Sequence, residues 1–145
     1  MKRMTIVLML MAAVAAAAAE PPEVRMPREG QRIGADGDDA CPAGRQCWQI
    51  HAEGSVPRGH AGIFAVEPLN ASPTIWIQNF PPGSAGGNVS ASIYLGNVRV
   101  GAKEYFRIYL LSCEGNHGLK AGETTIEEIP PVCEISAPVT VFRER

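Results

Sequence analysis

Clusters of charge of one sign are absent from this sequence of 145 residues, in which 13 Lys and Arg are interspersed with 15 Asp and Glu. A protein that binds nucleic acid or an anionic membrane surface needs a basic patch, so we expect neither as a partner. A sustained helical period of apolar residues is also absent, which argues against a fold built from helices. Aromatic residues are few, at 6% of the chain, so the position of each tryptophan and tyrosine is informative.

The groups that catalysis and metal binding need do not form a recognisable motif. No serine lies in a strand–turn–helix elbow, and paired carboxylates do not stand out. His51 and Glu53 would share one strand face, with His60 in a nearby loop, but such a pair is more often the solvated face of an outer strand. The acidic stretch DGDD at 36–39 lacks the later ligands of a calcium loop, which favours a solvated turn. We therefore expect no catalytic residue, no metal site and no cofactor.

Residues 1–19 have the three parts of a signal peptide: a positive start at Lys2 and Arg3, an apolar run over 4–14, and small residues at 17–19. The apolar run is shorter than the ~20 residues of a membrane-spanning helix, so we expect no transmembrane segment after cleavage. Without Lys2 and Arg3, 11 of the 13 basic residues remain against 15 acidic ones, a net charge of −4. We predict an exported protein, periplasmic or extracellular, and the alanine-rich signal is typical of bacterial export.

Four cysteines, Cys41, Cys47, Cys113 and Cys133, lie in the exported part of the chain. An even count in an oxidising compartment indicates two disulfides. Three pairings are possible, and we favour Cys41–Cys47 with Cys113–Cys133 because each closes a stretch rich in glycine, proline and charge. In a chain-entropy description the shorter loop contributes roughly 2 kcal/mol and the longer roughly 3 kcal/mol. Zinc is the alternative for four cysteines, but no C-x2-C spacing is present.

Residues 20–40 are polar and interrupted by proline and glycine, which predicts a flexible leader ahead of the domain. From 41 to 145 the pattern is one domain of short strands separated by turns. The strand-like segments are CWQIHAE, AGIFAVEP, TIWIQNF, NVSASIYL, EYFRIYLLSC and APVTVF. The one place for a short helix is GETTIEEI, in the loop between Cys113 and Cys133. We predict an all-β fold, an antiparallel β-sandwich of about seven short strands with a disulfide-braced loop.

The segments VEPL, IWIQ, IYLGN and GAKEYFRIYLLSC resemble the strands of small immunoglobulin-like modules in exported and envelope-associated bacterial proteins. The resemblance covers about half of the exported chain and carries no catalytic residue across. It implies an Ig-like β-sandwich with an accessory or binding role. The sequence departs from antibody-type domains, because Leu111 stands where those domains have a tyrosine two residues before the second cysteine.

The segment TIWIQNF places a tryptophan between two isoleucines, and neighbouring side chains in a strand point to opposite faces. Turning Trp76 to the core would also bury the Gln78 amide, which costs ~1–3 kcal/mol unless the amide is hydrogen-bonded. We therefore expect Ile75 and Ile77 to face the core, with Trp76 outward beside Gln78.

Two other strands repeat this arrangement of aromatic and polar residues. NVSASIYL would leave Tyr94 outward, and EYFRIYLL would leave Tyr105, Arg107 and Tyr109 outward. Aromatic rings beside polar groups suit a carbohydrate or a protein partner, although tyrosine and tryptophan are also common strand formers that a loop can half-cover. The candidate binding residues are Trp76, Gln78, Tyr94, Tyr105, Arg107 and Tyr109.

These observations predict a non-catalytic, exported binding or envelope-associated module whose partner is an unknown protein or carbohydrate. The alternative is a secreted inhibitor or effector that inserts the loop between Cys113 and Cys133 into a partner's cleft, because a braced loop loses less entropy on binding. A third possibility is an enzyme whose site assembles only in space.

Overall fold

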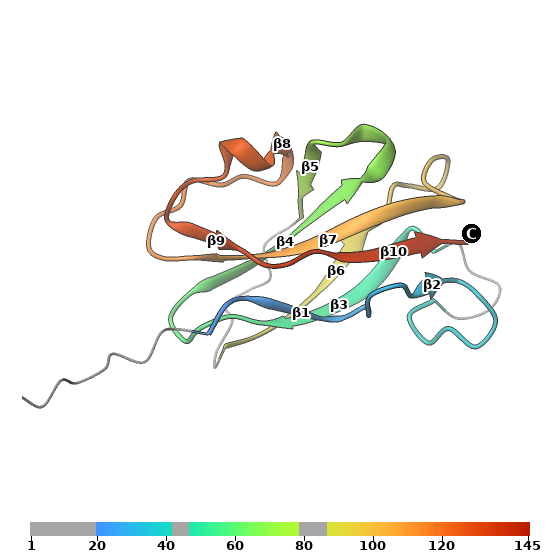
Figure 1. Ribbon diagram of the computed structural model, residues 1–145, viewed down its shortest axis with the longest axis horizontal. Helices are drawn as coiled ribbons and strands as arrows, with labels where there is room; N and C mark the ends of the chain where they lie inside the picture. Colours follow the sequence, from blue (N-terminus) through green and yellow to red (C-terminus); the bar gives the residue numbers. More distant parts are fainter. Residues whose placement is uncertain (1–19, 42–46, 79–86) are drawn as a thin grey trace, which may run out of the picture.

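The computed structural model describes residues 20–41, 47–78 and 87–145 (Figure 1), so the expected signal segment, 1–19, lies outside the described residues. Within them the chain forms β-strands and two single turns of 3-10 helix, and no α-helix. The all-β prediction is therefore confirmed. The strands are β1 (Glu23–Met26), β2 (Arg32–Ile33), β3 (Gln49–Ser55), β4 (Ala61–Pro68), β5 (Thr74–Ile77), β6 (Asn88–Tyr94), β7 (Glu104–Cys113), β8 (Gly122–Thr125), β9 (Cys133–Ile135) and β10 (Val139–Arg143), and the 3-10 turns are η1 (Leu69–Ala71) and η3 (Ile126–Glu128).

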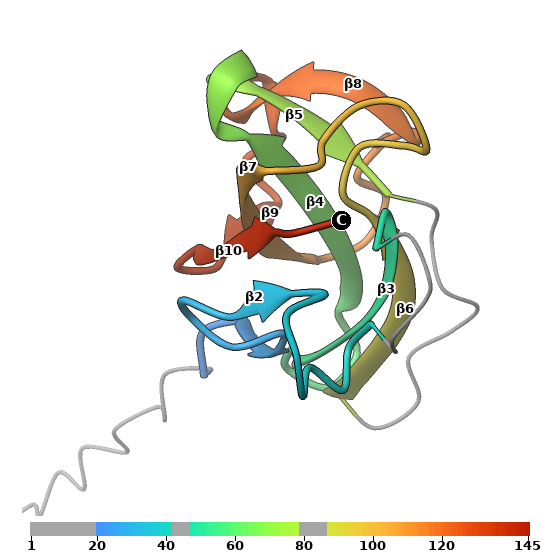
Figure 2. The same cartoon turned by 90° about the vertical axis from the view of Figure 1, so that its right-hand side faces the viewer.

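The strands form two sheets, which Figure 2 shows as separate layers. The smaller sheet has the order β1-β3-β6. The larger sheet has the order β2-β10-β7-β4-β5-β8, with β9 pairing to β7 beyond the end of β10. All of these pairs are antiparallel except that of β2 with β10. The six strand segments expected from the sequence are all present as β3, β4, β5, β6, β7 and β10.

Two hydrophobic cores lie on the two faces of the larger sheet. The first core fills the space between the sheets, where alternate residues of β3 and β6 meet the inner faces of β4 and β7. Its residues include Ile50, Ile93, Val66, Phe106 and Ile108. The second core lies on the outer face of the larger sheet and includes Ile63, Ile75, Ile77, Tyr109 and Leu111. Burial on both faces explains why β4 and β7 are nearly continuous apolar runs rather than alternating ones.

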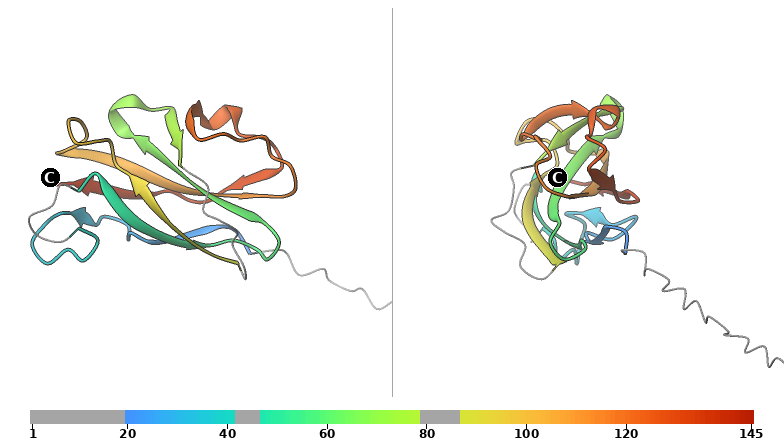
Figure 3. Two further views of the ribbon diagram at one scale, coloured as in Figure 1. Left: turned by 180° about the vertical axis from the view of Figure 1, so that it is seen from behind. Right: turned by 90° about the vertical axis from the view of Figure 1, so that its left-hand side faces the viewer.

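The segment between Cys113 and Cys133 covers this second core. Leu119, Ile126 and Ile129 pack against it, and Figure 3 shows the segment arching over the same side of the molecule as β5. The segment GETTIEEI is helical only over Ile126–Glu128, as a single 3-10 turn, because Gly122–Thr125 pairs with β5 as strand β8. The loop is therefore a packed cover rather than a projecting arm.

The expectation of a flexible leader over 20–40 is wrong. Strand β1 pairs with β3, and β2 pairs with β10. Val24 and Ile33 enter the first core, and Ile33 has no exposed area. Proline and glycine in this stretch mark turns between two short strands, and each strand is held by its backbone pairing and by one buried side chain.

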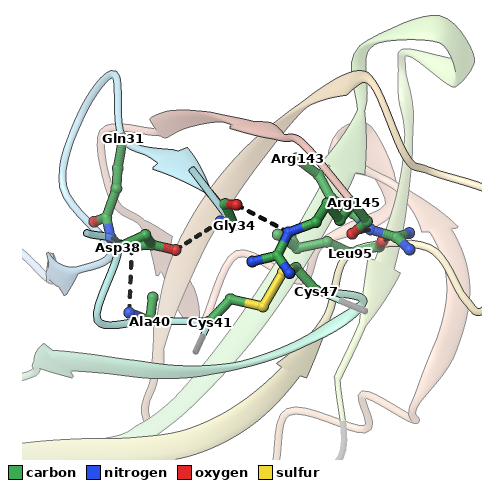
Figure 4. The surroundings of a disulfide bond; sticks show 9 residues. All are labelled: Gln31, Gly34, Asp38, Ala40, Cys41, Cys47, Leu95, Arg143 and Arg145. Atoms are coloured by element: carbon green, nitrogen blue, oxygen red, sulfur yellow. Dashed lines mark hydrogen bonds between the residues drawn. A yellow bond between two sulfur atoms is a disulfide. The ribbon is translucent and has the colours of Figure 1, made fainter. Parts of the chain in front are cut away.

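Both expected disulfides, Cys41–Cys47 and Cys113–Cys133, are confirmed. The first lies among residues brought together from both ends of the domain (Figure 4). Gly34 packs against it, since a Cβ on this glycine would lie 2.6 Å from the Cys47 sulfur. The Gly34 carbonyl accepts a hydrogen bond of 2.9 Å from the Arg145 side chain.

The acidic stretch at 36–39 does more than form a solvated turn. The Asp38 carboxylate accepts hydrogen bonds from the backbone N–H of Gly34 at 2.7 Å and of Ala40 at 3.2 Å, as Figure 4 shows. The Gln31 side-chain amide donates to the same carboxylate at 2.6 Å. Asp38 therefore organises the loop that carries Cys41.

Across residues 20–41, 47–78 and 87–145, no helix is long and apolar enough to cross a membrane.

Candidate functional site

Strand β5 places its alternate residues on two different faces of the larger sheet. Ile75 and Ile77 are buried in the second core, under the segment that the Cys113–Cys133 disulfide closes. Trp76 points to the opposite face, which it shares with its cross-strand partner Val66. That face is turned toward the smaller sheet, yet Trp76 is only half-buried. The core positions of Ile75 and Ile77 agree with the sequence pattern, whereas Trp76 stands at an edge of the interior rather than on an outer surface.

A pocket of about 520 Å³ opens at this edge. Its walls come from β4, β5, the end of β6, the loop between β6 and β7, and the start of β8, so both sheets contribute. Trp76 lines it from the larger sheet and Tyr94 from the smaller. The lining residues are Val66, Pro68, Trp76, Ile77, Gln78, Tyr94, Gly96, Asn97, Val100, Ala121 and Gly122.

Gln78 joins the two strands that carry Trp76 and Tyr94. Its side-chain oxygen accepts a hydrogen bond of 2.9 Å from the Tyr94 backbone N–H. Its side-chain nitrogen donates to the Trp76 carbonyl at 3.1 Å. The expectation that Gln78 stands outward is wrong, since only 5% of it is exposed. A buried amide with both ends hydrogen-bonded is stable, and here it connects the edges of the two sheets.

Tyr94 is partly exposed and is stacked against Trp48. The ring centroids are 5.6 Å apart and the ring planes differ by 16°. Trp48 precedes β3, the neighbour of β6 in the smaller sheet, and its carbonyl accepts a hydrogen bond from the Leu95 N–H. The stack supports the Tyr94 ring from a residue that does not itself line the pocket.

Arg143 holds the loop that forms the third wall of the pocket. One of its terminal nitrogens donates to the carbonyls of Leu95 at 2.8 Å, Asn97 at 3.1 Å and Val100 at 2.8 Å. The side chain is 1% exposed, and this burial lowers the pKa of the guanidinium. Gly101 has φ of 107°, and a Cβ there would lie 2.7 Å from the same nitrogen, so this close approach requires glycine.

The sequence patterns give no signal for the role of Arg143, because an arginine in the last strand reads as a solvated residue. The turn that Arg143 supports, at residues 96–100, is indicated by the sequence. Asn97 follows a glycine, and its side-chain oxygen accepts from the backbone N–H of Arg99 and Val100 at 2.8 and 3.0 Å. This is the turn-forming chemistry expected of asparagine.

Tyr105 does not belong to the pocket, although it was grouped with Trp76 and Tyr94 from the sequence. It is exposed and contacts Phe142 on the neighbouring strand β10, with ring centroids 4.8 Å apart. The guanidinium of Arg32 lies over the Phe142 ring at 5.1 Å. These residues form a separate surface on β2, β10 and β7.

Arg107 and Tyr109 form a third group around the buried carboxylate of Glu67. One Glu67 oxygen accepts from Arg107 and from the Tyr109 hydroxyl, each at 3.2 Å, and the other accepts from the Ser72 hydroxyl at 2.9 Å. Burial, and then the charge of Glu67, raises the pKa of Tyr109. The expectation that Tyr109 stands outward is wrong, because it is 8% exposed within the second core.

The histidines are engaged in local pairs. His51 lies 2.9 Å from Glu53 on an exposed strand face. His60 bridges the Ser112 hydroxyl at 2.8 Å and the Glu114 carboxylate at 3.0 Å. Ser, His and a carboxylate are the groups of a hydrolase triad, but Ser112 is 2% exposed inside β7, so a substrate has no access to its hydroxyl. Within the described ranges, no three or more His, Cys, Asp or Glu side chains gather to hold a metal ion.

Of the six candidate binding residues, the structure brings three together at the pocket, Trp76, Gln78 and Tyr94, and places the other three elsewhere. Comparison with known proteins adds no further residue, because no protein-family model, no curated protein and no solved structure matches the chain.

Proposed function

We propose that the protein is an exported, non-catalytic binding module that takes its ligand in the pocket between the edges of its two sheets. The observation that carries this proposal is the meeting of Trp76 and Tyr94 from different sheets across one pocket of about 520 Å³. Ligand pockets have volumes of about 300–1,000 Å³ and are lined mainly by apolar and aromatic side chains with a few placed polar groups.

Exposed apolar side chains support the same location. Among the described residues, the exposed large apolar side chains are those of Tyr94, Val98, Val100, Tyr105 and Val132. Tyr94 and Val100 line the pocket, and Val98 lies in the loop that forms its wall. Apolar side chains gathered around a hollow mark a ligand or partner site more often than scattered ones do.

Export is supported by the signal-like segment and by the two disulfides, which persist in oxidising compartments. The resemblance to immunoglobulin-like modules of exported and envelope-associated bacterial proteins supports a binding role. The inhibitor alternative has less support, because Leu119, Ile126 and Ile129 of the loop between Cys113 and Cys133 pack against the second core.

Retention of ligand by pocket variants tests the proposal. Immobilised wild-type protein, Trp76→Ala and Tyr105→Ala would each be exposed to soluble and detergent-extracted envelope fractions of the exporting cell, and the retained molecules identified by mass spectrometry. Tyr105→Ala is the matched control, because it removes an exposed aromatic from the other surface. We expect a ligand on wild type and Tyr105→Ala that is lost from Trp76→Ala. Equal retention by all three proteins would contradict the proposal.

A further inference from the structure

The charge of the pocket narrows the class of its ligand. None of the described residues that line it carries a charge, and they come from four strands and one loop. A carboxylate, phosphate or ammonium group entering such a pocket would lose its hydration without gaining a partner of opposite charge. The uncharged lining therefore favours a neutral ligand.

Hydrogen-bonding groups that have no partner within the protein narrow the class of ligand further. In the described part of the chain, no protein group pairs with the indole N–H of Trp76, the hydroxyl of Tyr94 or the side-chain N–H groups of Asn97. No buried side-chain nitrogen or oxygen there lacks a partner, so these groups reach solvent. A hydrocarbon chain filling the pocket would strip water from them and leave them unpaired, whereas hydroxyl groups both donate and accept and could replace that water.

Contacts within the protein hold Trp76 and Tyr94 in place. The Gln78 amide holds the Trp76 carbonyl and the Tyr94 N–H at its two ends, and Trp48 stacks on the Tyr94 ring. These two hydrogen bonds tie β5 to β6, so Gln78 helps to set the spacing between them. Walls ordered in advance reduce the entropy lost on binding, and they offer aromatic faces with polar groups at their edges.

We infer that the pocket binds a neutral saccharide, with the apolar face of a sugar ring against Trp76 or Tyr94 and its hydroxyls paired with the indole N–H, the tyrosine hydroxyl and the Asn97 amide. A pyranose ring combines an apolar face of C–H groups with a rim of hydroxyls, and has no charge. This inference rests on the proposed function and names the ligand class of the same pocket.

Three kinds of probe separate the possible ligands. The first is a panel of neutral hexasaccharides built from glucose, galactose, mannose or N-acetylglucosamine units. The second is a pair of charged saccharides, oligogalacturonate and heparin hexasaccharide. The third is the neutral apolar dye N-phenyl-1-naphthylamine. Affinities would be measured by isothermal titration calorimetry for the saccharides and by fluorescence for the dye, with far-ultraviolet circular dichroism to check that each variant folds.

The variants are Trp76→Ala, Trp76→Phe, Tyr94→Ala and the control Tyr105→Ala. We expect at least one neutral hexasaccharide to bind, with its affinity falling about tenfold or more in Trp76→Ala and in Tyr94→Ala, a change of about 1.4 kcal/mol for each factor of ten. Trp76→Phe keeps a ring face but loses the indole N–H, so its loss is expected to be smaller. Tyr105→Ala should bind as wild type does. Because Trp76 and Tyr94 come from different sheets, a folding failure in one variant leaves the other as a test.

Other outcomes overturn the inference in distinguishable ways. Dye binding that depends on Trp76, without binding of any neutral saccharide, would overturn the saccharide inference and leave the pocket as the binding site. Preference for the charged saccharides would overturn the argument from the uncharged lining. Saccharide binding unchanged in both Trp76→Ala and Tyr94→Ala would place the sugar elsewhere. No pocket-dependent binding of any probe would overturn the inference, and equal retention of envelope ligand by Trp76→Ala would then overturn the proposed function as well.

Discussion

Replacing Ile77 and Trp76 in turn by alanine tests the arrangement of strand β5 on which the pocket depends. The two residues are neighbours, so the pair compares opposite faces of the same strand at the same depth in the sheet. Ile77 is buried in the second core opposite Ala65. Emptying such a site removes packed methyl groups and leaves a cavity, at a cost of ~2–5 kcal/mol.

Trp76→Ala should cost less, on the order of 1 kcal/mol, because Trp76 lines an open pocket and is only partly buried. The hydrogen bond from Gln78 reaches the backbone carbonyl of Trp76 and survives the substitution. Urea unfolding at pH 7 with the disulfides intact, followed by far-ultraviolet circular dichroism, gives both free energies without relying on tryptophan emission.

The reverse order would refute this reasoning. A one-residue slip of β5 exchanges its two faces, which would bury Trp76 and expose Ile77. Trp76→Ala would then be the more damaging change, at ~3–5 kcal/mol. In that case Trp76 could not line a pocket, and the proposed ligand site would lose one of its walls.

Further predictions concern the N-terminal strands, the pocket loop and pH. Ile33→Ala should lower the free energy of unfolding by ~2–5 kcal/mol in the same urea assay. A change under ~0.5 kcal/mol would instead indicate that residues 20–40 are a flexible leader. Arg143→Met should destabilise the fold by ~3–5 kcal/mol, because it leaves three loop carbonyls without their buried charged donor; it should also speed hydrogen exchange in 96–103, and unchanged exchange there would contradict the anchoring role. Burial raises the pKa of Tyr109 above its ordinary value of 10.0, so the stability that its neutral hydroxyl contributes is complete below that pH and is lost as the pH rises through the folded-state pKa. Stability should therefore fall as the pH rises above about 10, and less steeply in Tyr109→Phe. Identical slopes in the two proteins would show that Tyr109 is not the cause.

Much of the sheet structure could be predicted from the sequence, because it depends on local alternation. In β3 and β6, every second residue is apolar and is buried or partly buried, so one face of the smaller sheet was predictable. The nearly continuous apolar run of β4 is what burial on both faces requires. The disulfide pairing was also predictable, because each bridge closes a stretch rich in glycine, proline and charge.

The features that escaped prediction depend on distant parts of the chain. Tyr109 lies in the polar register of β7, yet a cover 10 to 20 residues later in the chain buries it. Gln78 is buried because its amide finds backbone partners on β5 and β6, and a pattern of period two cannot show such partners. Arg143 is buried because it supplies a donor to three carbonyls more than 40 residues away. Each is a polar group whose burial is decided by tertiary hydrogen bonds.

The pocket itself could be predicted only in part. The aromatic residues Trp76 and Tyr94 were identified as binding candidates from their polar neighbours. Their meeting across one hollow depends on the packing of the two sheets and on the Arg143-anchored loop, which no local pattern encodes. Tyr105 shows the same limit, since its pattern matches that of Tyr94 while its position is on another surface.

The central claim is that ligand enters the hollow between Trp76 and Tyr94, and a chemical-shift titration tests it most directly. The isotope-labelled protein would be titrated with the tightest-binding probe of the panel, saccharide or dye, while amide and indole signals are followed. The account predicts that the largest changes fall on the Trp76 indole N–H and on the backbone amides of Gln78, Asn97 and Gly122. Largest changes on Tyr105 and Phe142, with the Trp76 indole signal unmoved, would contradict it.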